Sequence, residues 1–429
     1  MLPTLSGAQV ITTWKDTSSF VDLVSAFFDR EGNFYIADQQ NNNVWKIDTA
    51  CLITSIAGTG SGGYNGDSIP ATSAELKQPN AVIVDSIGNI YIADALNSRI
   101  RKIDRASGLI YTIAGTGVPG YNGDNIPAVN AQLKGPNDIC FDKHGNMYIS
   151  EYANHRIRKI NTSGIITTIA GTGIAGCTVN GGRADTTEIG GLTGVCADTI
   201  GNIYITDSYE FGVYKVDMSG IITLVAGTTL GYSYNGDNIP ATSAQLDPHH
   251  PRIDQSGDLF VCDVANNRIR KVDATGIIHT VAGIGSSGNI SDGDNGAADS
   301  AKIPAPIGVA FDRCGNMYIA QVGNSSKIRK VAFNPSCTDT PCGPSLSVAS
   351  NFVETEFNVY PNPVKENLSL SFSKGDGTVG VYNIIGQLVY SSVIHEGVNA
   401  IDMRRFAAGV YLLELMSDGK RAMRKVVKE

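Results

Sequence analysis

Residues 63–117 read GYNGDSIPATSAELKQPNAVIVDSIGNIYIADALNSRIRKIDRASGLIYTIAGTG, and this stretch decides the fold. Within it, an Asp precedes a Gly-Asn turn and a Tyr-centred strand, and a basic strand follows. The same phrase or a near copy of it occurs six times, at successive intervals of 56, 57, 56, 56 and 58 residues. Its anchor aspartates are Asp29, Asp85, Asp142, Asp198, Asp254 and Asp312. A period this long and this regular indicates a repeat architecture.

Each repeat holds four short strand signals, which in the second repeat are AVIVD, NIYIAD, RIRKID and LIYTIAG. These segments are rich in Ile, Val and Tyr, and Gly, Asn and Asp separate them. The apolar residues alternate with a period of two, and no long stretch has a helical period. Four antiparallel strands per repeat describe a propeller blade, which leaves only short sheet edges exposed. We therefore predict an all-β fold with a six-bladed β-propeller.

The last blade lacks a strand of its own. The sixth repeat supplies IGVAFD, NMYIAQ and KIRKVAF and then runs into NPSCTDTPCGPS. Residues 8–14, AQVITTW, match the fourth strand of another repeat, SGIITTIAG at residues 163–171. We expect Val10 to Thr13 to complete the blade that begins at Ile307.

The complete unit resembles an NHL repeat, and the resemblance covers roughly residues 1–333. We assign residues 1–333 to the propeller. A Pro-, Ser-, Thr- and Cys-rich stretch at 334–355 has the composition of a linker. Residues 356–429 alternate strand and turn signals, which predicts a small Ig-like β-sandwich as a separate domain.

This C-terminal segment also resembles the type A sorting domain of the type IX secretion system. The matching residues are Tyr360, Pro361, Asn362 and Pro363, then Asn383 to Gln387, Gly409 to Tyr411, and Lys425 to Lys428. The resemblance implies the type IX machinery as a partner of residues 356–429. It also implies a location outside the cell or on the outer surface of a gram-negative bacterium. Residues 1–20 lack the basic start and apolar core of a signal peptide, so we expect a trimmed chain or a start upstream. No segment is long and apolar enough to predict a transmembrane span.

The net charge of -8 opposes non-specific binding of nucleic acid, and we expect no nucleic-acid partner. Basic residues do recur on the third strand of several repeats. We expect that strand to lie toward the outside of its blade and to show water a charged face. The residues are Arg99, Arg101, Lys102, Arg156, Arg158, Lys159, Arg268, Arg270 and Lys271.

Seven of the eight cysteines fall into two groups. Cys140, Cys196 and Cys262 lie on inner or second strands and are expected to be small buried residues. Cys51 and Cys314 lie in bottom turns, and Cys337 and Cys342 follow the last strand of the sixth repeat. We predict at least one disulfide among these four, between Cys314 and Cys337 or Cys342. The alternatives are a local Cys337–Cys342 bridge or no bridge.

A ligand site is expected on the top face, where the first strand of each blade begins. The positions five before the anchor Asp include Asn80, Asn137, Thr193 and His249, and the next position includes Asp138 and His250. The His249-His250 pair departs most sharply from the repeat. Metal-dependent lyases and lactonases use six-bladed propellers with ligands of these types, so a divalent metal at the channel mouth is the alternative cofactor.

Two further features lie on the predicted top face. Tyr64, Tyr121 and Tyr234 occupy Gly-rich loops and offer rings for recognition, unless each packs back onto its own loop. The residues that end the second strands form an apparent acidic ring, which we interpret as turn caps. These are Asp38, Asp94, Glu151, Asp207, Asp263 and Gln321.

Together these features favour a secreted or surface-attached propeller that binds a protein, peptide or glycan, with no catalysis and no resident cofactor. The alternative is a metal-dependent lyase or lactonase built around His249 and His250. A purely structural spacer is a third possibility.

Overall fold

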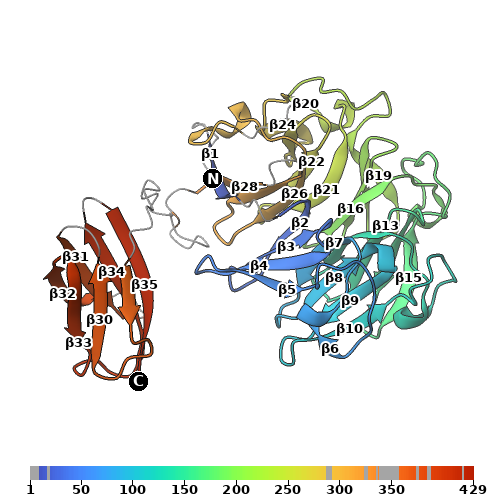
Figure 1. The fold of residues 1–429 in the computed structure, drawn as a ribbon. Helices are drawn as coiled ribbons and strands as arrows, with labels where there is room; N and C mark the ends of the chain where they lie inside the picture. Colours follow the sequence, from blue (N-terminus) through green and yellow to red (C-terminus); the bar gives the residue numbers. More distant parts are fainter. Residues whose placement is uncertain are drawn as a thin grey trace. The chain divides into compact units, whose positions relative to one another are not determined.

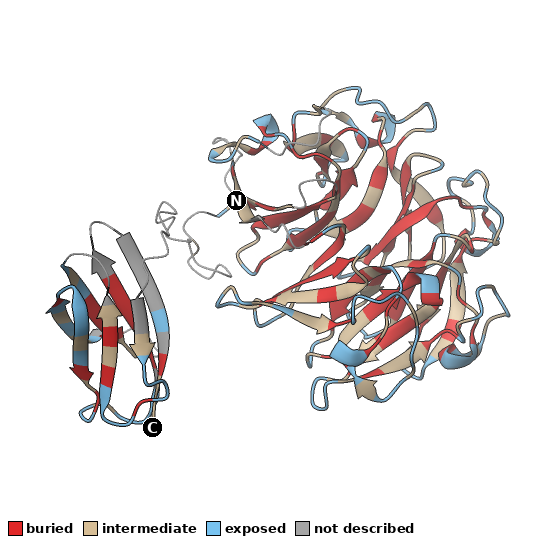
Figure 2. Ribbon diagram, in the orientation of Figure 1, coloured by how far each residue is buried: buried red, intermediate tan, exposed pale blue. Residues whose placement is uncertain are grey.

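Six antiparallel sheets of four or five strands make up the described part of the N-terminal unit (Figure 1). The computed structural model describes residues 9–16, 20–286, 292–322, 327–334, 337, 357–372, 376–383, 388–417 and 420–429. The chain separates into two units, Met1–Gly343 and Pro344–Glu429. Buried residues concentrate in the strands and exposed ones in the loops (Figure 2).

Each blade begins with an inner strand, and the inner strands of neighbouring blades contact one another. Blade 1 contains β2 (Leu23–Phe28), β3 (Phe34–Asp38), β4 (Asn43–Ile47) and β5 (Ile53–Ala57). Blade 2 contains β7 (Pro79–Val84), β8 (Ile90–Asp94), β9 (Arg99–Ile103) and β10 (Leu109–Ala114). Blade 3 contains β12 (Pro136–Phe141), β13 (Met147–Glu151), β14 (Arg156–Ile160) and β15 (Ile165–Ala170).

The second half of the ring repeats this order. Blade 4 contains β16 (Leu192–Ala197), β17 (Ile203–Asp207), β18 (Gly212–Val216) and β19 (Ile222–Gly227). Blade 5 contains β21 (Pro248–Ile253), β22 (Leu259–Asp263), β23 (Arg268–Val272) and β24 (Ile277–Ala282). Blade 6 contains β26 (Pro306–Phe311), β27 (Met317–Gln321), β28 (Lys327–Ala332) and the first strand of the chain, β1 (Val10–Asp16). The six-bladed propeller is therefore confirmed.

Four blades carry a short fifth strand that the sequence did not predict. These outer strands are β6 (Ile69–Pro70), β11 (Ile126–Pro127), β20 (Ile239–Pro240) and β25 (Gly296–Ala297). Three of them end in Pro, which lacks an N–H donor and is therefore confined largely to sheet edges. Short 3-10 turns accompany the blades: η1 (Ala71–Ser73), η2 (Ala95–Asn97), η3 (Ala128–Asn130), η4 (Ala184–Thr186), η5 (Ala241–Ser243) and η6 (Ala298–Ser300).

The N-terminal strand closes the ring as the sequence predicts. β1 pairs antiparallel with β28, with Val10 opposite Ala332 and Thr12 opposite Lys330 (Figure 1). Ile11 is fully buried, in one core with residues of blades 5 and 6. Opening the ring would therefore break a whole strand of hydrogen bonds and expose apolar surface.

The anchor aspartates organise the bottom turns as caps. Asp85 Oδ1 accepts hydrogen bonds from the N–H groups of Ile87 and Asn89, at 3.0 and 2.9 Å. Its Oδ2 accepts from Asn89 Nδ2 at 2.8 Å and from the Tyr91 hydroxyl at 3.0 Å. Asp142 and Asp312 make the same set of bonds. The Asp, Gly-Asn and Tyr of the repeat thus form one hydrogen-bonded turn, which explains why they recur together.

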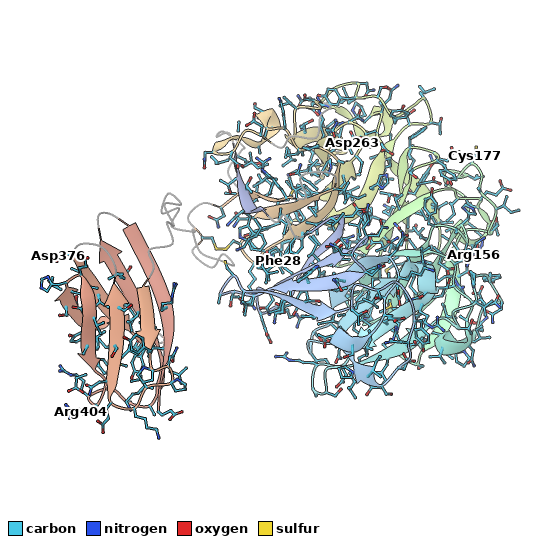
Figure 3. All side chains as sticks on the ribbon, in the orientation of Figure 1. Phe28, Arg156, Cys177, Asp263, Asp376 and Arg404 are labelled. Carbon is cyan, nitrogen blue, oxygen red and sulfur yellow. A yellow bond between two sulfur atoms is a disulfide. The ribbon has the colours of Figure 1, made fainter. Side chains whose placement is uncertain are left out.

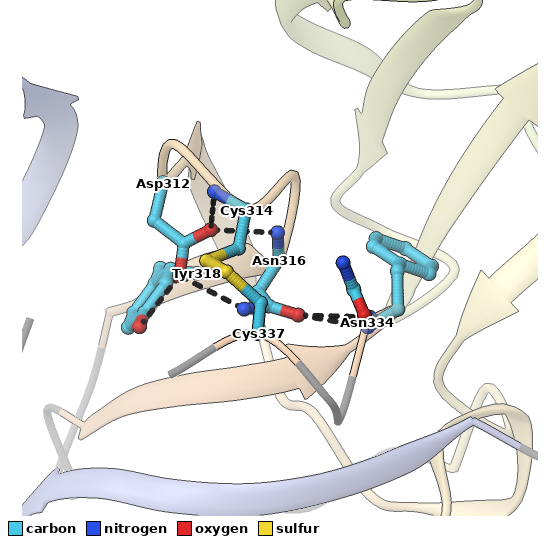
Figure 4. Close-up of a disulfide and its surroundings, with 7 residues drawn as sticks. Asp312, Cys314, Asn316, Tyr318, Asn334 and Cys337 are labelled. Carbon is cyan, nitrogen blue, oxygen red and sulfur yellow. Dashed lines mark hydrogen bonds between the residues drawn. A yellow bond between two sulfur atoms is a disulfide. The ribbon is translucent and has the colours of Figure 1, made fainter. Parts of the chain in front are cut away.

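A disulfide joins Cys314 to Cys337, with the two Cα atoms 6.0 Å apart (Figure 4). It ties the chain beyond β28 to the bottom turn of blade 6, as predicted. Cys51 is also disulfide-bonded, whereas Cys342 lies outside the described residues. Cys196 and Cys262 are buried free thiols, as expected. Cys140 is only partly buried, because its side chain faces the channel described below.

The C-terminal unit is a sandwich of two antiparallel sheets in its described residues. One sheet contains β29 (Phe357–Tyr360), β30 (Asn367–Phe372) and β33 (Gly397–Asp402). The other contains β32 (Leu388–Ile394), β31 (Gly377–Tyr382), β34 (Gly409–Ser417) and β35 (Lys420–Lys428). Both sheets contribute to one apolar core, which confirms the predicted β-sandwich.

Two predicted sorting-motif residues hold this sandwich together locally. Asn362 Oδ1 accepts a hydrogen bond from the Val427 N–H at 2.8 Å, which joins the Pro-Asn-Pro segment to the final strand. The Tyr411 hydroxyl donates to the Ala407 carbonyl at 2.9 Å. Residues 384–387 of the motif lie outside the described residues. No helix in the described ranges is long and apolar enough to span a membrane.

Candidate ligand-binding face at the channel mouth

A run of side-chain hydrogen bonds joins blades 1 to 5 at the top of the channel. Gln39 Nε2 donates to Asn80 Oδ1 at 2.6 Å, and Asn80 Nδ2 donates to Asn137 Oδ1 at 2.7 Å. Asn137 Nδ2 then donates to the Thr193 carbonyl at 2.7 Å. Thr193 Oγ1 donates to the Pro248 carbonyl at 2.9 Å. We call these residues the polar girdle.

β-Bulges aim the girdle residues into the channel mouth. Asn80, Asn137 and Thr193 each fall at a shift in register between the inner strand and the second strand of their blade. A bulged residue is left out of the ladder and its side chain is re-aimed. Sequence analysis expected these side chains at the mouth, but it gave no sign that they bond to one another.

The girdle keeps hydrogen-bonding capacity for a ligand. Asn80 and Asn137 are only partly buried. An amide carries two N–H donors and an oxygen with two lone pairs, so a side chain that makes one bond of each kind is not saturated. The mouth therefore presents pre-oriented amide groups.

Two exposed tyrosines lie on the same face of the ring as the girdle, in the loops that follow the second strands of blades 3 and 4. Tyr152 and Tyr209 are 38% and 51% exposed, and their hydroxyl oxygens lie 3.2 Å apart. Their rings meet edge to face, with centroids 6.0 Å apart. The hydrogen bond with Tyr209 is the main reason why the pKa of Tyr152 is raised to about 12. His155 lies next to Tyr209, with a centroid distance of 6.4 Å.

Blade 4 is built to hold Tyr209 in this place. Asp207 Oδ2 accepts the Gly190 N–H at 2.7 Å, and Asp207 Oδ1 accepts the N–H groups of Gly191 and Tyr209 at 3.0 and 2.9 Å. A Cβ atom at Gly190 would lie 2.7 Å from the Tyr209 Cβ atom. Only glycine therefore leaves room for the ring. The other repeats have no Gly-Gly pair at the position of Gly190 and Gly191. This departure was the feature of the sequence that could have indicated a special role for the loop around Tyr209.

The aromatic surface continues toward blade 5. Phe211 follows Tyr209 by two residues and contacts Tyr232, with centroids 5.5 Å apart. Tyr232 is 52% exposed. We call Tyr152, Tyr209 and Tyr232 the upper aromatic surface. Sequence analysis missed all three. Tyr152 and Tyr209 stand outside the repeated GYNGD loops, and Tyr232 shares a loop with Tyr234 but has no counterpart in the loops of Tyr64 and Tyr121.

The three tyrosines that sequence analysis selected each lie against an arginine side chain. Tyr64 lies against Arg99, with the guanidinium carbon 3.7 Å from the ring centroid. The matching contacts are Arg156 over Tyr121 at 3.9 Å and Arg268 over Tyr234 at 3.7 Å; Arg156 is labelled in Figure 3. These rings are 36 to 38% exposed. Arginine covers one face of each ring, and a binding role for them stays a prediction.

The expectation that the basic third strands show all their charge to water is wrong. Arg101, Arg158 and Arg270 are fully buried. They pair with loop aspartates Asp67, Asp124 and Asp237 at 2.9, 3.1 and 2.9 Å. A buried charge needs a partner, and the loop Asp and the Tyr ring supply one from the preceding inter-blade segment. The other basic residues of these strands are partly exposed, namely Arg99, Lys102, Arg156, Lys159, Arg268 and Lys271.

The second-strand acids are caps, as predicted, and three of them also face a buried arginine. Asp94 Oδ1 accepts the Lys77 N–H at 2.8 Å, and Glu151 Oε1 accepts the Lys134 N–H at 3.0 Å. Burial is the main reason that the pKa of Asp94 is raised to about 6 and that of Glu151 to about 7. They serve the scaffold and do not form a free acidic ring.

His249 and His250 have different surroundings. His249 Nε2 lies 3.5 Å from Asp247 Oδ1. His250 is 3% exposed, and neither ring nitrogen has a hydrogen-bond partner among the described residues. Burial is the main cause that lowers the pKa of His250 to about 4, with Asp138 acting in the opposite direction. His250 is therefore neutral at pH 7.

Asp138 forms an ion pair with Arg252, a residue that sequence analysis did not select. Arg252 Nη1 donates to Asp138 Oδ2 at 2.9 Å, and Arg252 Nη2 donates to Asp138 Oδ1 at 3.3 Å. The Val195 N–H also donates to Oδ2 at 3.1 Å. Burial acts to raise the pKa of Asp138, but Arg252 and His250 bring it below its ordinary value.

Three of the residues considered for a divalent metal are already engaged by other side chains. The amides of Asn80 and Asn137 bond to each other, and Arg252 occupies both oxygens of Asp138. Within the described ranges, no three His, Cys, Asp or Glu residues are grouped so that they could hold a metal ion. A metal here would have to displace existing bonds.

Comparison with known proteins defines both parts of the chain. Residues 358–429 match the family model of the secretion system C-terminal sorting domain. The propeller is similar to a protein of unknown function from Bacteroides thetaiotaomicron, with 16% identity, a TM-score of 0.55 and 76% of each chain covered. It is equally similar to an auxiliary nutrient binding protein from the same organism, with 16% identity, a TM-score of 0.54 and 76% coverage of each chain.

A sequence relative is the suppressor of quenching 1 protein of Arabidopsis thaliana chloroplasts, 27% identical over 297 residues. The match covers 66% of this chain and 27% of that protein, so the chain corresponds to about a quarter of the relative's length. The protein is thus a six-bladed β-propeller with a C-terminal sorting domain. The sorting domain implies handling by the type IX secretion system and delivery to the cell surface or beyond.

Proposed function

We propose that this protein is a noncatalytic binding propeller that recognises a glycan on its top face, once exported. The observation that carries the proposal is the exposed Tyr152–Tyr209 pair on the same face of the ring as the polar girdle. Aromatic rings pack on the apolar faces of sugars, and amides hydrogen-bond to their hydroxyl groups. The sorting domain, which places the protein where free and surface glycans occur, supports the same reading.

The likeness to a solved auxiliary nutrient binding protein is consistent with a binding role, although an identity of 16% speaks to the fold alone. A protein or peptide ligand on the same face is the other form of this proposal. It would use the same rings as anchors.

A glycan array probed with the full chain is the first test, followed by calorimetry with each hit. Tyr209→Ala and Tyr152→Ala should each weaken binding by about tenfold or more, since a central aromatic contact typically contributes above 1 kcal/mol. Tyr209→Phe keeps the ring and should retain most of the affinity. A hit whose affinity is unchanged in all three variants would place the ligand elsewhere. Binding only on a peptide array would favour the protein ligand.

A metal-dependent lyase or lactonase at His249 and His250 is the competing function. Plasma mass spectrometry of the purified protein, beside a His249→Ala/His250→Ala variant, distinguishes it. About one metal ion per chain that is lost in the variant would displace the binding proposal and justify lactone and lyase assays.

A further inference from the structure

The bottom end of the central channel contains a cavity of about 320 Å³. All six inner strands line it, because each contributes the last residues before its bottom turn. We call it the lower cup. It lies at the opposite end of the inner strands from the polar girdle, so it is separate from the face proposed above.

The wall of the cup is mainly apolar and aromatic. Phe27 and Phe28 come from β2, Phe141 from β12 and Phe311 from β26, and Phe28 is labelled in Figure 3. All four side chains are only partly buried, so their rings are accessible from the cavity. Half-exposed aromatic rings around a concave space are the usual lining of a small-molecule site.

The thiols in the wall add no charge. Cys140 and Cys196 line the cup. Burial is the main cause that raises the pKa of Cys196 to about 12, and it raises that of Cys140 as well. Both stay protonated at neutral pH and behave as small apolar groups.

Among the described residues that line the cup, Arg252 is the one charged side chain. On one side it bonds to Asp138 and to the Pro251 carbonyl, and these bonds use three N–H groups. A guanidinium has five such donors, so Arg252 keeps donors for a further partner. Asp138 does not line the cup and neutralises Arg252 from behind. The cup therefore combines an apolar wall with one fixed donor group.

We propose that the lower cup binds a small apolar molecule that ends in an oxygen acceptor, with the oxygen at Arg252 and the apolar body among the phenylalanine rings. The volume is at the small end of ligand pockets and suits a body of about eight carbons. Because Asp138 balances the charge of Arg252, both a hydroxyl and a carboxylate can serve as the acceptor. An ammonium group cannot, since it has no lone pair and would face a cation.

Calorimetry of the full chain with three matched probes tests the chemistry. The probes are octan-1-ol, octanoate and octylammonium, which share one apolar body and differ in the head group. At least one of the two oxygen-headed probes should bind with a 1:1 stoichiometry, and octylammonium should bind at least about tenfold more weakly. A stronger octanoate signal would identify an anionic ligand, and a stronger octanol signal a neutral one. If neither octan-1-ol nor octanoate binds, or if octylammonium binds as tightly as they do, the proposal is overturned.

Two substitutions test the location. Ala197 lines the cup and is partly buried, so Ala197→Phe would fill the cavity and should lower affinity at least about tenfold. Ile200 lies nearby in the same bottom turn but is 64% exposed, so Ile200→Phe is the matched control and should bind normally. Unchanged binding in a folded Ala197→Phe protein would contradict the assignment.

A third variant tests the head-group contact. Asp138→Asn/Arg252→Gln removes both charges together, which avoids leaving one buried and unpaired. This variant should lose the preference for oxygen-headed probes over octylammonium. A preference that persists in a folded double variant would show that Arg252 does not receive the acceptor. Circular dichroism and the thermal midpoint establish folding in each case.

Discussion

The guanidinium of Arg101 and the carboxylate of Asp94 are both fully buried and lie 3.6 Å apart on neighbouring strands of blade 2. The same relationship joins Arg158 to Glu151 at 3.6 Å, and Arg270 to Asp263 at 3.5 Å. Each arginine also reaches an Asp in the loop that enters its blade. The charges thus fasten the inter-blade loops to the blades.

Removal of Arg101 should therefore destabilise the propeller strongly. Arg101→Met leaves Asp94 buried without its cation, which typically costs about 3 to 5 kcal/mol. Arg99 also lies over the Tyr64 ring, 3.7 Å from its centroid, but is only partly buried, so Arg99→Met should cost about 1 kcal/mol or less. Urea unfolding measures both. Equal losses in the two variants would show that burial of the pair is unimportant.

The disulfide between Cys314 and Cys337 should contribute measurably to stability. It closes a segment with a sequence separation of 23 residues, and loss of such a bridge typically costs about 3 kcal/mol. Cys314→Ser should lower the thermal midpoint of the propeller accordingly. Cys177 is an exposed free thiol, so Cys177→Ser serves as the control and should change stability by less than about 0.5 kcal/mol. An unchanged midpoint in Cys314→Ser would mean that the bridge constrains little.

His250 should make stability depend on pH. Its folded pKa of about 4 lies below the ordinary value of 6.5, so the unfolded chain binds more protons between these values. The contribution of His250 is present above about pH 6.5 and is lost as the pH falls toward 4. A shift of this size corresponds to about 3 kcal/mol.

The measurement is the free energy of unfolding at several pH values for the native protein and for His250→Gln. The buried acids Asp94, Glu151 and Asp263 are common to both proteins, so their opposing effects cancel in the difference. Asp138, Arg252 and His249 surround the ring and are likewise unchanged. His144→Gln, at an exposed ring, gives the background of a surface substitution. Parallel pH profiles for the native protein and His250→Gln would contradict the prediction.

Gly194 should be required for the packing of blade 4 against blade 5. A Cβ atom there would lie 2.4 Å from Pro251 Cδ and 2.7 Å from His250 Cα. Gly194→Ala should therefore cost about 1 to 3 kcal/mol through overpacking. Gly308 occupies the equivalent position of blade 6, where the nearest atoms would be 3.4 Å away. Gly308→Ala should be better tolerated, and an equal loss of stability in both variants would argue against the close approach.

Deletion of residues 358–429 should prevent export without unfolding the propeller. The sorting domain has its own core, and the chain separates into two units between Gly343 and Pro344. In the native host, the truncated protein should accumulate inside the outer membrane, as measured by cell fractionation and proteinase accessibility. Normal appearance at the surface would show that the propeller carries its own export information.

The repeated parts of the fold could be predicted because their causes are local. In five of the six bottom turns the Asp, Asn and Tyr bond to one another within six residues, so the period is visible in the sequence. The N-terminal strand could be placed because it copies a missing repeat element. The Cys314–Cys337 disulfide could be predicted because the turn that holds Cys314 and the end of the strand that precedes Cys337 both had to lie on the bottom face.

The parts that escaped prediction depend on partners far apart in the sequence or on departures from the repeat. Arg101 seemed exposed because its partner Asp67 lies 34 residues earlier, in a different structural segment. Asp138 and Arg252 stand on inner strands of different blades, 114 residues apart. The opposite charges of Asp138 and Arg252 could have indicated their pairing. Sequence analysis selected the adjacent pair His249 and His250 because it departs more sharply from the repeat. The Tyr152–Tyr209 pair arises where two single repeats depart from the pattern.

The pairing of β1 with β28 also sets the order of events in folding. Val10 lies in β1 and is made before every other described strand of the propeller, whereas Ala332 ends β28, the last strand of blade 6 to be translated. Until then the first strand has no partner in its sheet, and its apolar side chains remain available to other chains. Contacts between distant segments form slowly, and unpaired edges promote aggregation while they last. Ring closure must therefore be a late event in folding. Newly translated chains, in which β1 is still unpaired, are the ones most prone to aggregation.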